Sequence, residues 1–244
     1  MARPPDPHAR SALVSAARKE FVKAGIQKAR IEDITRACGL SKGAFYLHYE
    51  SKEALFRDLV KQLEARFEQL RLGREKAYRA LIGRGLQGKR DARPFVAELS
   101  EIDAREDRQL LELLWEWRDV TDVLLRGSQG TEFEGVMWTM LDREASRVET
   151  ECRALKDARL MRDDVSADVV GMMIVGTYLL VARRLSTLEQ KPDFEHWVRS
   201  LQLLIADGTA SGPLRAQRDA ALKRAARPRR ARKTRSAPPK RQRR

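Results

Sequence analysis

Apolar residues recur every three or four positions along most of this 244-residue chain, and this helical period is what most restricts its fold. No segment alternates apolar and polar residues with the period of two that is typical of strands. Breaks in the pattern fall at Gly25, Gly39, Gly127 and Pro192. The sequence therefore predicts an all-α fold, with helices at 10–24, 31–38, 42–49, 52–72, 75–86, 94–103, 107–125, 132–155, 165–188 and 194–206.

Residues 31–49 predict two short helices joined by a tight turn. Gly39 permits the turn, and Ser41 can cap the second helix. Ile34, Leu40 and Phe45 are placed to form a small core between the two helices. The second helix then projects its polar and small side chains outward, as in a helix-turn-helix whose recognition helix lies in the major groove of DNA.

Residues 8–67 closely resemble the DNA-binding domain of the TetR family of bacterial transcriptional regulators. The resemblance implies a three-helix DNA-binding domain with its helix-turn-helix at about 30–49. It also implies a helical effector-binding and dimerisation domain at 68–210. The matching residues are Phe21, Gly25, Asp33, Ile34, Gly39, Ser41, Gly43, Phe45, Tyr46, Tyr49, Lys52 and Leu55.

Within this stretch, Lys42 and Lys52 are expected to meet phosphates, Lys52 from a helix N-terminus. Arg30 stands where the family usually has a hydroxyl cap. The Thr35 hydroxyl can reach a phosphate or bond to its own helix. The predicted DNA-binding residues are Arg30, Thr35, Ser41, Lys42, Gly43, Ala44, Tyr46, Leu47, His48, Tyr49 and Lys52.

Most of the net charge of +14 lies in residues 213–244, which hold 14 basic side chains and one acidic side chain. This segment has no aromatic residue and contains Pro228, Pro238 and Pro239. Residues 211–244 are therefore predicted to be a disordered basic tail. It could solubilise the protein, serve as a localisation signal or contact phosphates without regard to sequence. The last possibility leaves an architectural, nucleoid-type DNA binder as the alternative function.

The chain between the motif and the tail shows no catalytic constellation or metal-ligand spacing. Residues 83–88 fit the dinucleotide-binding pattern G-x-G-x-x-G, but a helical pattern and not a strand precedes them, so they are interpreted as a helix end and loop. Bulky apolar residues on two central helices favour either a pocket for a hydrophobic small-molecule effector or an ordinary core. Arg118 could anchor an anionic group or be a solvated charge. The predicted effector-pocket residues, taken from a group that also includes Trp117 and Met140, are Trp115, Arg118, Met137, Trp138 and Leu141.

The segment 165–188 is apolar on nearly every face, and 194–206 carries an apolar stripe. Such helices need more partners than one domain offers, and the resemblance implies that the last two helices form a homodimer interface. The predicted interface residues are Val169, Met173, Gly176, Leu180, Trp197, Leu201 and Leu204.

The longest uncharged stretch, 169–182, is too short to span a bilayer, and the first ten residues contain no apolar leader. With only two cysteines, Cys38 and Cys152, the chain is expected to be cytoplasmic and to have no membrane partner. The predicted function is that of a repressor, without enzymatic activity or cofactor. It would bind a palindromic operator in double-stranded DNA as a homodimer and be released by an effector.

Overall fold

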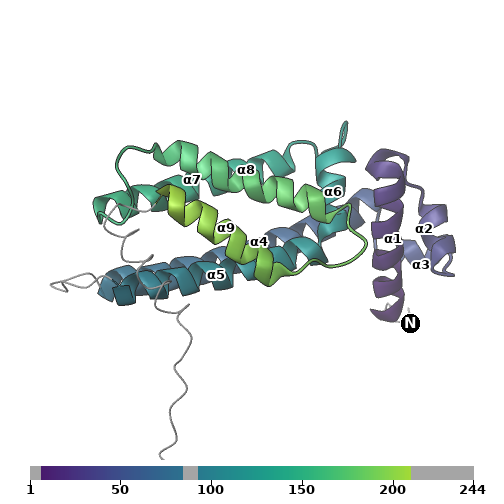
Figure 1. The fold of residues 1–244 in the computed structure, drawn as a ribbon. Helices are drawn as coiled ribbons and strands as arrows, with labels where there is room; N and C mark the ends of the chain where they lie inside the picture. The colour runs from purple at the N-terminus through teal and green to yellow at the C-terminus, as the bar shows by residue number, and fades with distance from the viewer. Residues whose placement is uncertain (1–6, 85–92, 210–244) are drawn as a thin grey trace, which may run out of the picture.

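The structure is a computed structural model that describes residues 7–84 and 93–209. Within these ranges the chain forms nine α-helices and no β-strand, which confirms the predicted fold class (Figure 1). The predicted tail, 211–244, lies outside the described residues. The helices are α1 (Pro7–Lys28), α2 (Ile31–Ala37), α3 (Lys42–Tyr46), α4 (Lys52–Arg84), α5 (Arg93–Glu116), α6 (Arg118–Arg126), α7 (Val136–Asp157), α8 (Ala167–Leu185) and α9 (Phe194–Thr209).

Helices α1, α2 and α3 lie together at one end of the molecule, where α4 begins (Figure 1). Their apolar faces meet in one buried core, which includes Phe21, Ile34, Phe45 and Leu59. The Phe21 and Phe56 rings pack edge to face with their centroids 5.2 Å apart. The small core predicted from the sequence between α2 and α3 is thus part of a larger one.

Helix α4 is one continuous helix of 33 residues, so the predicted separation into 52–72 and 75–86 is wrong. Gly73 does not break it, because Arg71 is hydrogen-bonded to Glu68 on one side of the glycine and to Glu75 on the other. This continuity carries α4 from the N-terminal bundle into the C-terminal half, across the domain boundary predicted near residue 67.

The predicted break near residues 103–107 is also absent, since α5 runs unbroken to Glu116. The chain instead turns at Trp117, whose ring is buried between α1 and α6. The buried core of the N-terminal bundle includes Val120 and Leu124 of α6, and Phe133 packs on Phe56 at 4.9 Å between ring centroids. The two halves therefore share apolar packing at their junction.

The C-terminal half is a bundle in which α7 and α8 lie side by side and α9 crosses toward α5 (Figure 1). A second buried cluster joins α5, α8 and α9 through Leu111, Leu185 and Val198. A third joins α7 to α8 through Val148 and Val175. Between these clusters, α4, α5, α7, α8 and α9 enclose a cavity.

Candidate nucleic-acid interface and ligand cavity

The turn between α2 and α3 is held by local main-chain contacts. Gly39 has φ +69°, a left-handed conformation that L side chains rarely adopt, and the Leu40 N–H donates to the Thr35 carbonyl at 2.9 Å. The Ser41 hydroxyl oxygen accepts from the Ala44 N–H at 3.1 Å, as expected of an N-cap. These contacts orient α3 so that Phe45 points into the core and the rest of the helix faces outward.

The outward face of α3 brings together most of the residues predicted to contact DNA. Lys42, Gly43, Tyr46 and Leu47 are exposed, and the Leu47 side chain reaches 69% exposure at the end of the helix. Ser41 is also exposed, Ala44 and His48 are half-buried, and Arg30 is exposed at the N-cap of α2. Lys42 forms an ion pair with Glu32 of α2 and lowers the pKa of that carboxyl.

Two residues predicted to contact DNA, Thr35 and Tyr49, form hydrogen bonds within the domain instead. Thr35 is buried, and its hydroxyl donates to the Glu32 carbonyl at 3.2 Å, the local bond considered as its alternative. Tyr49 is buried, and burial raises the pKa of its hydroxyl, which accepts from Arg10 Nε at 3.1 Å. Neither side chain presents its polar group on the outward face of α3.

Lys52 also departs from its predicted role. Its Nζ donates to the carbonyls of Gln27 at 2.7 Å and Ala29 at 2.8 Å, and the side chain is only 18% exposed. These carbonyls lie at the C-terminal end of α1, which the ammonium group therefore ties to the first turn of α4. Two of its three N–H donors are used in this contact rather than for a phosphate.

The junction between the two halves contains an ion pair and main-chain hydrogen bonds that the sequence did not predict. Arg18 of α1 holds Asp119 of α6 through two hydrogen bonds of 2.6 Å, and it also donates to the Glu116 carbonyl at 2.8 Å. Gly25, with φ +71°, brings the main chain against Gly127, and the Ile26 N–H donates to the Gly127 carbonyl at 3.1 Å. The close approach explains why both positions are glycine: a Cβ on Gly25 would lie 3.3 Å from the Gly127 oxygen.

The cavity in the C-terminal half has a volume of about 350 Å³. Met137 and Leu141, which were predicted to line an effector pocket, are in its wall, as is Met140. Much of the remaining wall is aliphatic and comes from α5, α7 and α8. A space of this size with a largely apolar wall suits a small organic ligand.

The other three predicted pocket residues are not in this wall. Trp138 faces solvent and is 60% exposed. The Arg118 guanidinium lies 4.0 Å from the Trp115 ring centre and donates to the Trp115 carbonyl at 2.8 Å, while the Trp115 ring packs toward α8 and α9. Trp138 follows a lining residue by one position, and the helical rotation of about 100° per residue turns it away.

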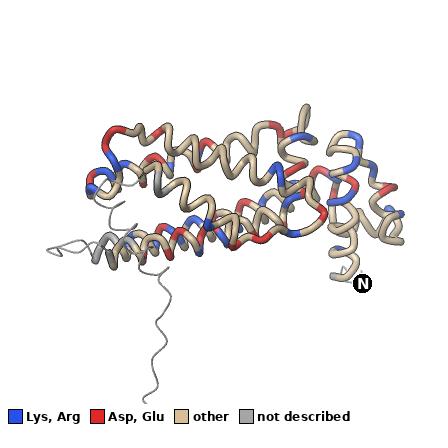
Figure 2. The backbone as a smooth tube through the Cα atoms, viewed as in Figure 1, with Lys and Arg blue, Asp and Glu red and all other residues tan. Residues whose placement is uncertain are grey.

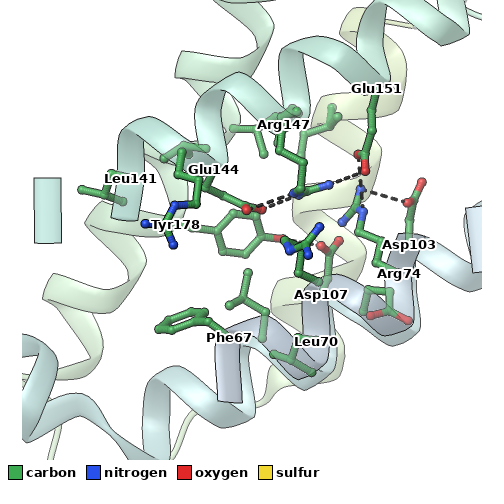
Figure 3. A pocket seen from close by; sticks show the side chains of 18 of the residues that line it. Phe67, Leu70, Arg74, Asp103, Asp107, Leu141, Glu144, Arg147, Glu151 and Tyr178 are labelled. Atoms are coloured by element: carbon green, nitrogen blue, oxygen red, sulfur yellow. Dashed lines mark hydrogen bonds and ion pairs between the residues drawn. The ribbon is translucent and has the colours of Figure 1, made fainter. Parts of the chain in front are cut away.

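One side of the cavity is charged (Figure 3). A chain of contacts runs from Glu144 through Arg147 to Glu151, with Glu151 Oε2 lying 3.6 Å from Arg74 Nε. The chain continues from Arg74 to Asp103, whose carboxylate also accepts from the Tyr78 hydroxyl. Burial raises the pKa of Asp103 to about 6, although the neighbouring Arg74 opposes that rise.

Sequence reasoning missed these charged residues, but the pattern contains a signal for them. Asp103 and Asp107 fall on the same i, i+4 face of α5 as Leu99 and Leu110, all of which line the cavity. On α4, Arg74 likewise continues a face that carries Phe67 and Leu70. Charged residues within an apolar helical stripe mark a polar site inside the fold.

The residues predicted to form a dimer interface lie on α8 and α9, and several are exposed apolar side chains. Leu180 is 71% exposed and Leu204 is 74% exposed, and Val169 and Met173 are about half exposed. Gly176, Trp197 and Leu201 are half-buried. The charged residues of α8 lie near its ends, so most of the helix is tan in Figure 2. Exposed apolar side chains that gather on one helix face are typical of surfaces that bind a partner.

Among the helices of residues 7–84 and 93–209, none has the length and apolar character needed to cross a membrane. The same residues contain no group of three or more His, Cys, Asp or Glu side chains arranged to hold a metal ion.

Comparison with known proteins relates the N-terminal bundle to one family. Residues 13–59 match the family described as bacterial regulatory proteins, tetR family. The chain is 34% identical over 61 residues to the uncharacterized HTH-type transcriptional regulator YdgC of Bacillus subtilis, a match covering 25% of this chain and about a third (31%) of that relative. It is 28% identical over 162 residues to the HTH-type transcriptional repressor Rv1474c of Mycobacterium tuberculosis, covering 66% of this chain and 73% of that protein.

Solved structures extend the likeness of fold beyond that bundle. A TetR-like transcriptional regulator from Rhodococcus sp. RHA1 superposes with a TM-score of 0.58 at 19% identity, covering 84% of this chain and 98% of that one. SmeT is a repressor from Stenotrophomonas maltophilia. Its complex with triclosan superposes with a TM-score of 0.52 at 19% identity, covering 85% of this chain and 94% of SmeT. The N-terminal helix-turn-helix domain of this chain thus belongs to the TetR family of bacterial regulatory proteins.

Proposed function

We propose that this protein is a transcriptional repressor that binds a palindromic operator as a homodimer and is released when a small molecule occupies the cavity. In this proposal residues 8–67 read DNA, and residues 68–210 bind the effector and form the dimer. One observation carries the proposal: a single helix, α4, begins beside the recognition helix and then supplies part of the cavity wall.

The outward face of α3 supports the DNA-reading role. Tyr46 and Leu47 are exposed on a face with small neighbours, Gly43 and Ala44, which allow close approach to a groove. Lys42 can exchange its ion pair with Glu32 for a phosphate, because both side chains are about half exposed and gain little from pairing in water. Lys52 acts in this scheme by fixing α4 to α1.

The exposed apolar faces of α8 and α9 support the homodimer. A two-fold dimer buries the same surface on both protomers, so Leu180 and Leu204 would meet their own copies or close neighbours. Two recognition helices related by that axis read half-sites about 34–36 Å apart, or a multiple of that spacing. The operator would therefore be an inverted repeat.

In this proposal, α4 couples ligand binding in the cavity to the position of the DNA-binding helices. Phe67, Leu70 and Arg74 line the cavity, while Lys52, at the other end of the same helix, ties it to α1. A ligand that fits the cavity better in one position of α4 favours that position, and the recognition helices move with it. The triclosan complex of SmeT is a ligand-bound example of a similar fold.

The test is selection of genomic DNA fragments by the purified full-length protein, followed by binding to the enriched sequence at several salt concentrations. We expect an inverted repeat that is bound by a dimer. The reading as a specific repressor fails if the enriched fragments share no repeat.

The alternative function is an architectural DNA binder, favoured by the 14 basic side chains of residues 213–244. Deletion of that segment separates the two functions. A specific repressor keeps its preference for the inverted repeat over random DNA, with a shallower dependence on salt. An architectural binder loses most of its affinity for both kinds of DNA.

A further inference from the structure

The charges around the cavity are not balanced. Its wall contains seven acidic side chains and four arginines, a formal excess of three negative charges. Most of the acids have a basic partner: Glu144 and Glu151 contact Arg147, and Asp103 contacts Arg74. Asp107 differs from these acids, because it is buried and forms no ion pair within 4 Å among the described residues.

Asp107 of α5 is buried at the cavity wall, and its hydrogen-bond donors are neutral. The Tyr178 hydroxyl of α8 donates to Oδ1 at 2.5 Å, and Gln202 Nε2 of α9 donates to Oδ2 at 3.4 Å. Within the described part of the chain, no cationic nitrogen lies within 4 Å of this carboxylate. Burial raises the pKa of Asp107, while the Tyr178 hydrogen bond and the more distant Arg74 guanidinium oppose that rise.

A second polar group at the same wall is also unused. Arg74 Nε is buried and has no hydrogen-bond partner among the described residues, although Glu151 Oε2 lies 3.6 Å away. A buried donor of this kind is uncommon in folded proteins, because its lost hydration is not replaced. The wall thus offers a buried carboxylate without a direct ion pair and a buried N–H donor without a hydrogen bond.

The remainder of the cavity suits an apolar body next to a positive charge. The rings of Phe67 and Tyr178 line the same cavity as Asp107 (Figure 3), and aromatic rings can attract cations through their faces. Met137, Met140 and Leu141 supply flexible apolar surface farther along.

We propose that the ligand of this cavity is an amphipathic organic cation, with its ammonium group beside Asp107 and its apolar body against the methionines of α7. A hydrogen-bond acceptor near the charged end of the ligand would also satisfy Arg74 Nε. This proposal rests on the proposed function for its consequence on DNA, but the ligand class is read from the cavity alone.

The experiment measures binding to the purified full-length protein by calorimetry for three probes with the same ten-carbon tail: decyltrimethylammonium, decanol and decanoate. All are used below the concentrations at which they aggregate. We expect the cation to bind at least about tenfold more tightly than the alcohol, the range for a hydrogen-bonded or paired charge, and the anion to bind most weakly.

Variants then locate the charge. Asp107→Asn keeps the shape and an oxygen that accepts from Tyr178 but removes the charge, and we expect cation binding to weaken about tenfold with little change for decanol. Tyr178→Phe keeps the carboxylate, so the preference for the cation should persist. Glu112→Gln, on the same helix but paired with Lys191 on the surface, is the matched control and should bind all three probes as the parent does.

The proposal is overturned if decanol or decanoate binds as tightly as the cation, or if Asp107→Asn, shown by its thermal unfolding to be folded, retains the full cation preference. Displacement of an operator fragment tests the proposed function separately. A cation that binds at Asp107 without releasing DNA refutes effector control but supports the ligand class. Release of DNA by decanol, with no tighter binding of the cation, refutes the ligand class but supports effector control.

Discussion

The Arg18–Asp119 pair should couple the two halves of the protein more strongly than an ordinary surface ion pair. Its two hydrogen bonds of 2.6 Å form a bidentate contact, and the side chains are only 23% and 29% exposed. The Arg18 guanidinium also lies 5.0 Å from the Trp117 ring centre. Bidentate geometry and partial burial both strengthen such a pair relative to one in open solvent.

The expected magnitude lies between two limits. Exposed ion pairs contribute about 0.2–1 kcal/mol, and hydrogen bonds to charged groups contribute about 1.5–3 kcal/mol. A pair with about a quarter of its surface in water should therefore have a coupling energy of about 1–2 kcal/mol. Arg57 and Glu132 form a similar pair at the same junction, but they are 44% and 48% exposed, so about 0.5 kcal/mol or less is expected.

The assay is a double-mutant cycle on the free energy of unfolding in urea, with Arg18→Ala, Asp119→Ala and the double variant at one protomer concentration. The cycle of Arg57→Ala with Glu132→Ala provides the control. A coupling energy for the first pair that is no larger than that of the control, or within about 0.3 kcal/mol of zero, would refute the reasoning from burial and bidentate geometry.

Three further predictions concern DNA binding, dimerisation and pH. In filter binding, Lys42→Ala should weaken binding to all DNA and reduce its salt dependence, whereas Leu47→Ala should relax the preference for the operator. In urea unfolding, Leu47→Ala should change the free energy of unfolding by less than about 0.5 kcal/mol. If Leu47→Ala weakens binding to all DNA sequences equally, the role of Leu47 is contradicted. Leu180→Glu combined with Leu204→Glu should convert the dimer to a monomer in sedimentation, with Val22→Glu on α1 as an exposed apolar control that leaves it unchanged. Because burial raises the pKa of Asp107, its carboxyl stays protonated to a higher pH in the folded protein than in the unfolded chain. The contribution of Asp107 to the free energy of unfolding is therefore most favourable at low pH and is lost as the pH rises through the folded-state pKa. The free energy of unfolding of Asp107→Asn, relative to that of the parent, should therefore increase as the pH rises above about 4, and a difference that is constant or shrinks would contradict it.

The helix-turn-helix could be predicted because its determinants are close together in the chain. Gly39 makes the turn, Ser41 caps α3, and Phe45 enters the core at the spacing of one helical turn. Helix ends were less predictable. Gly73 looks like a break, but Arg71 and Glu75 on either side of it are hydrogen-bonded, and α4 continues from the helix-turn-helix bundle to the cavity wall.

The sequence by itself determined the all-α fold and the outward face of α3, since periodicity, capping and turn chemistry act over a few residues. The family followed from the resemblance of the N-terminal motif. Only the tertiary structure decided what each polar side chain does. Lys52 finds carbonyls of α1, and Tyr49 meets Arg10 of the same helix, so their polar groups are taken up within the fold. The cavity likewise draws its wall from helices more than a hundred residues apart, which is why Asp107 and Tyr178 meet there while Trp138, beside Met137 in the chain, faces water.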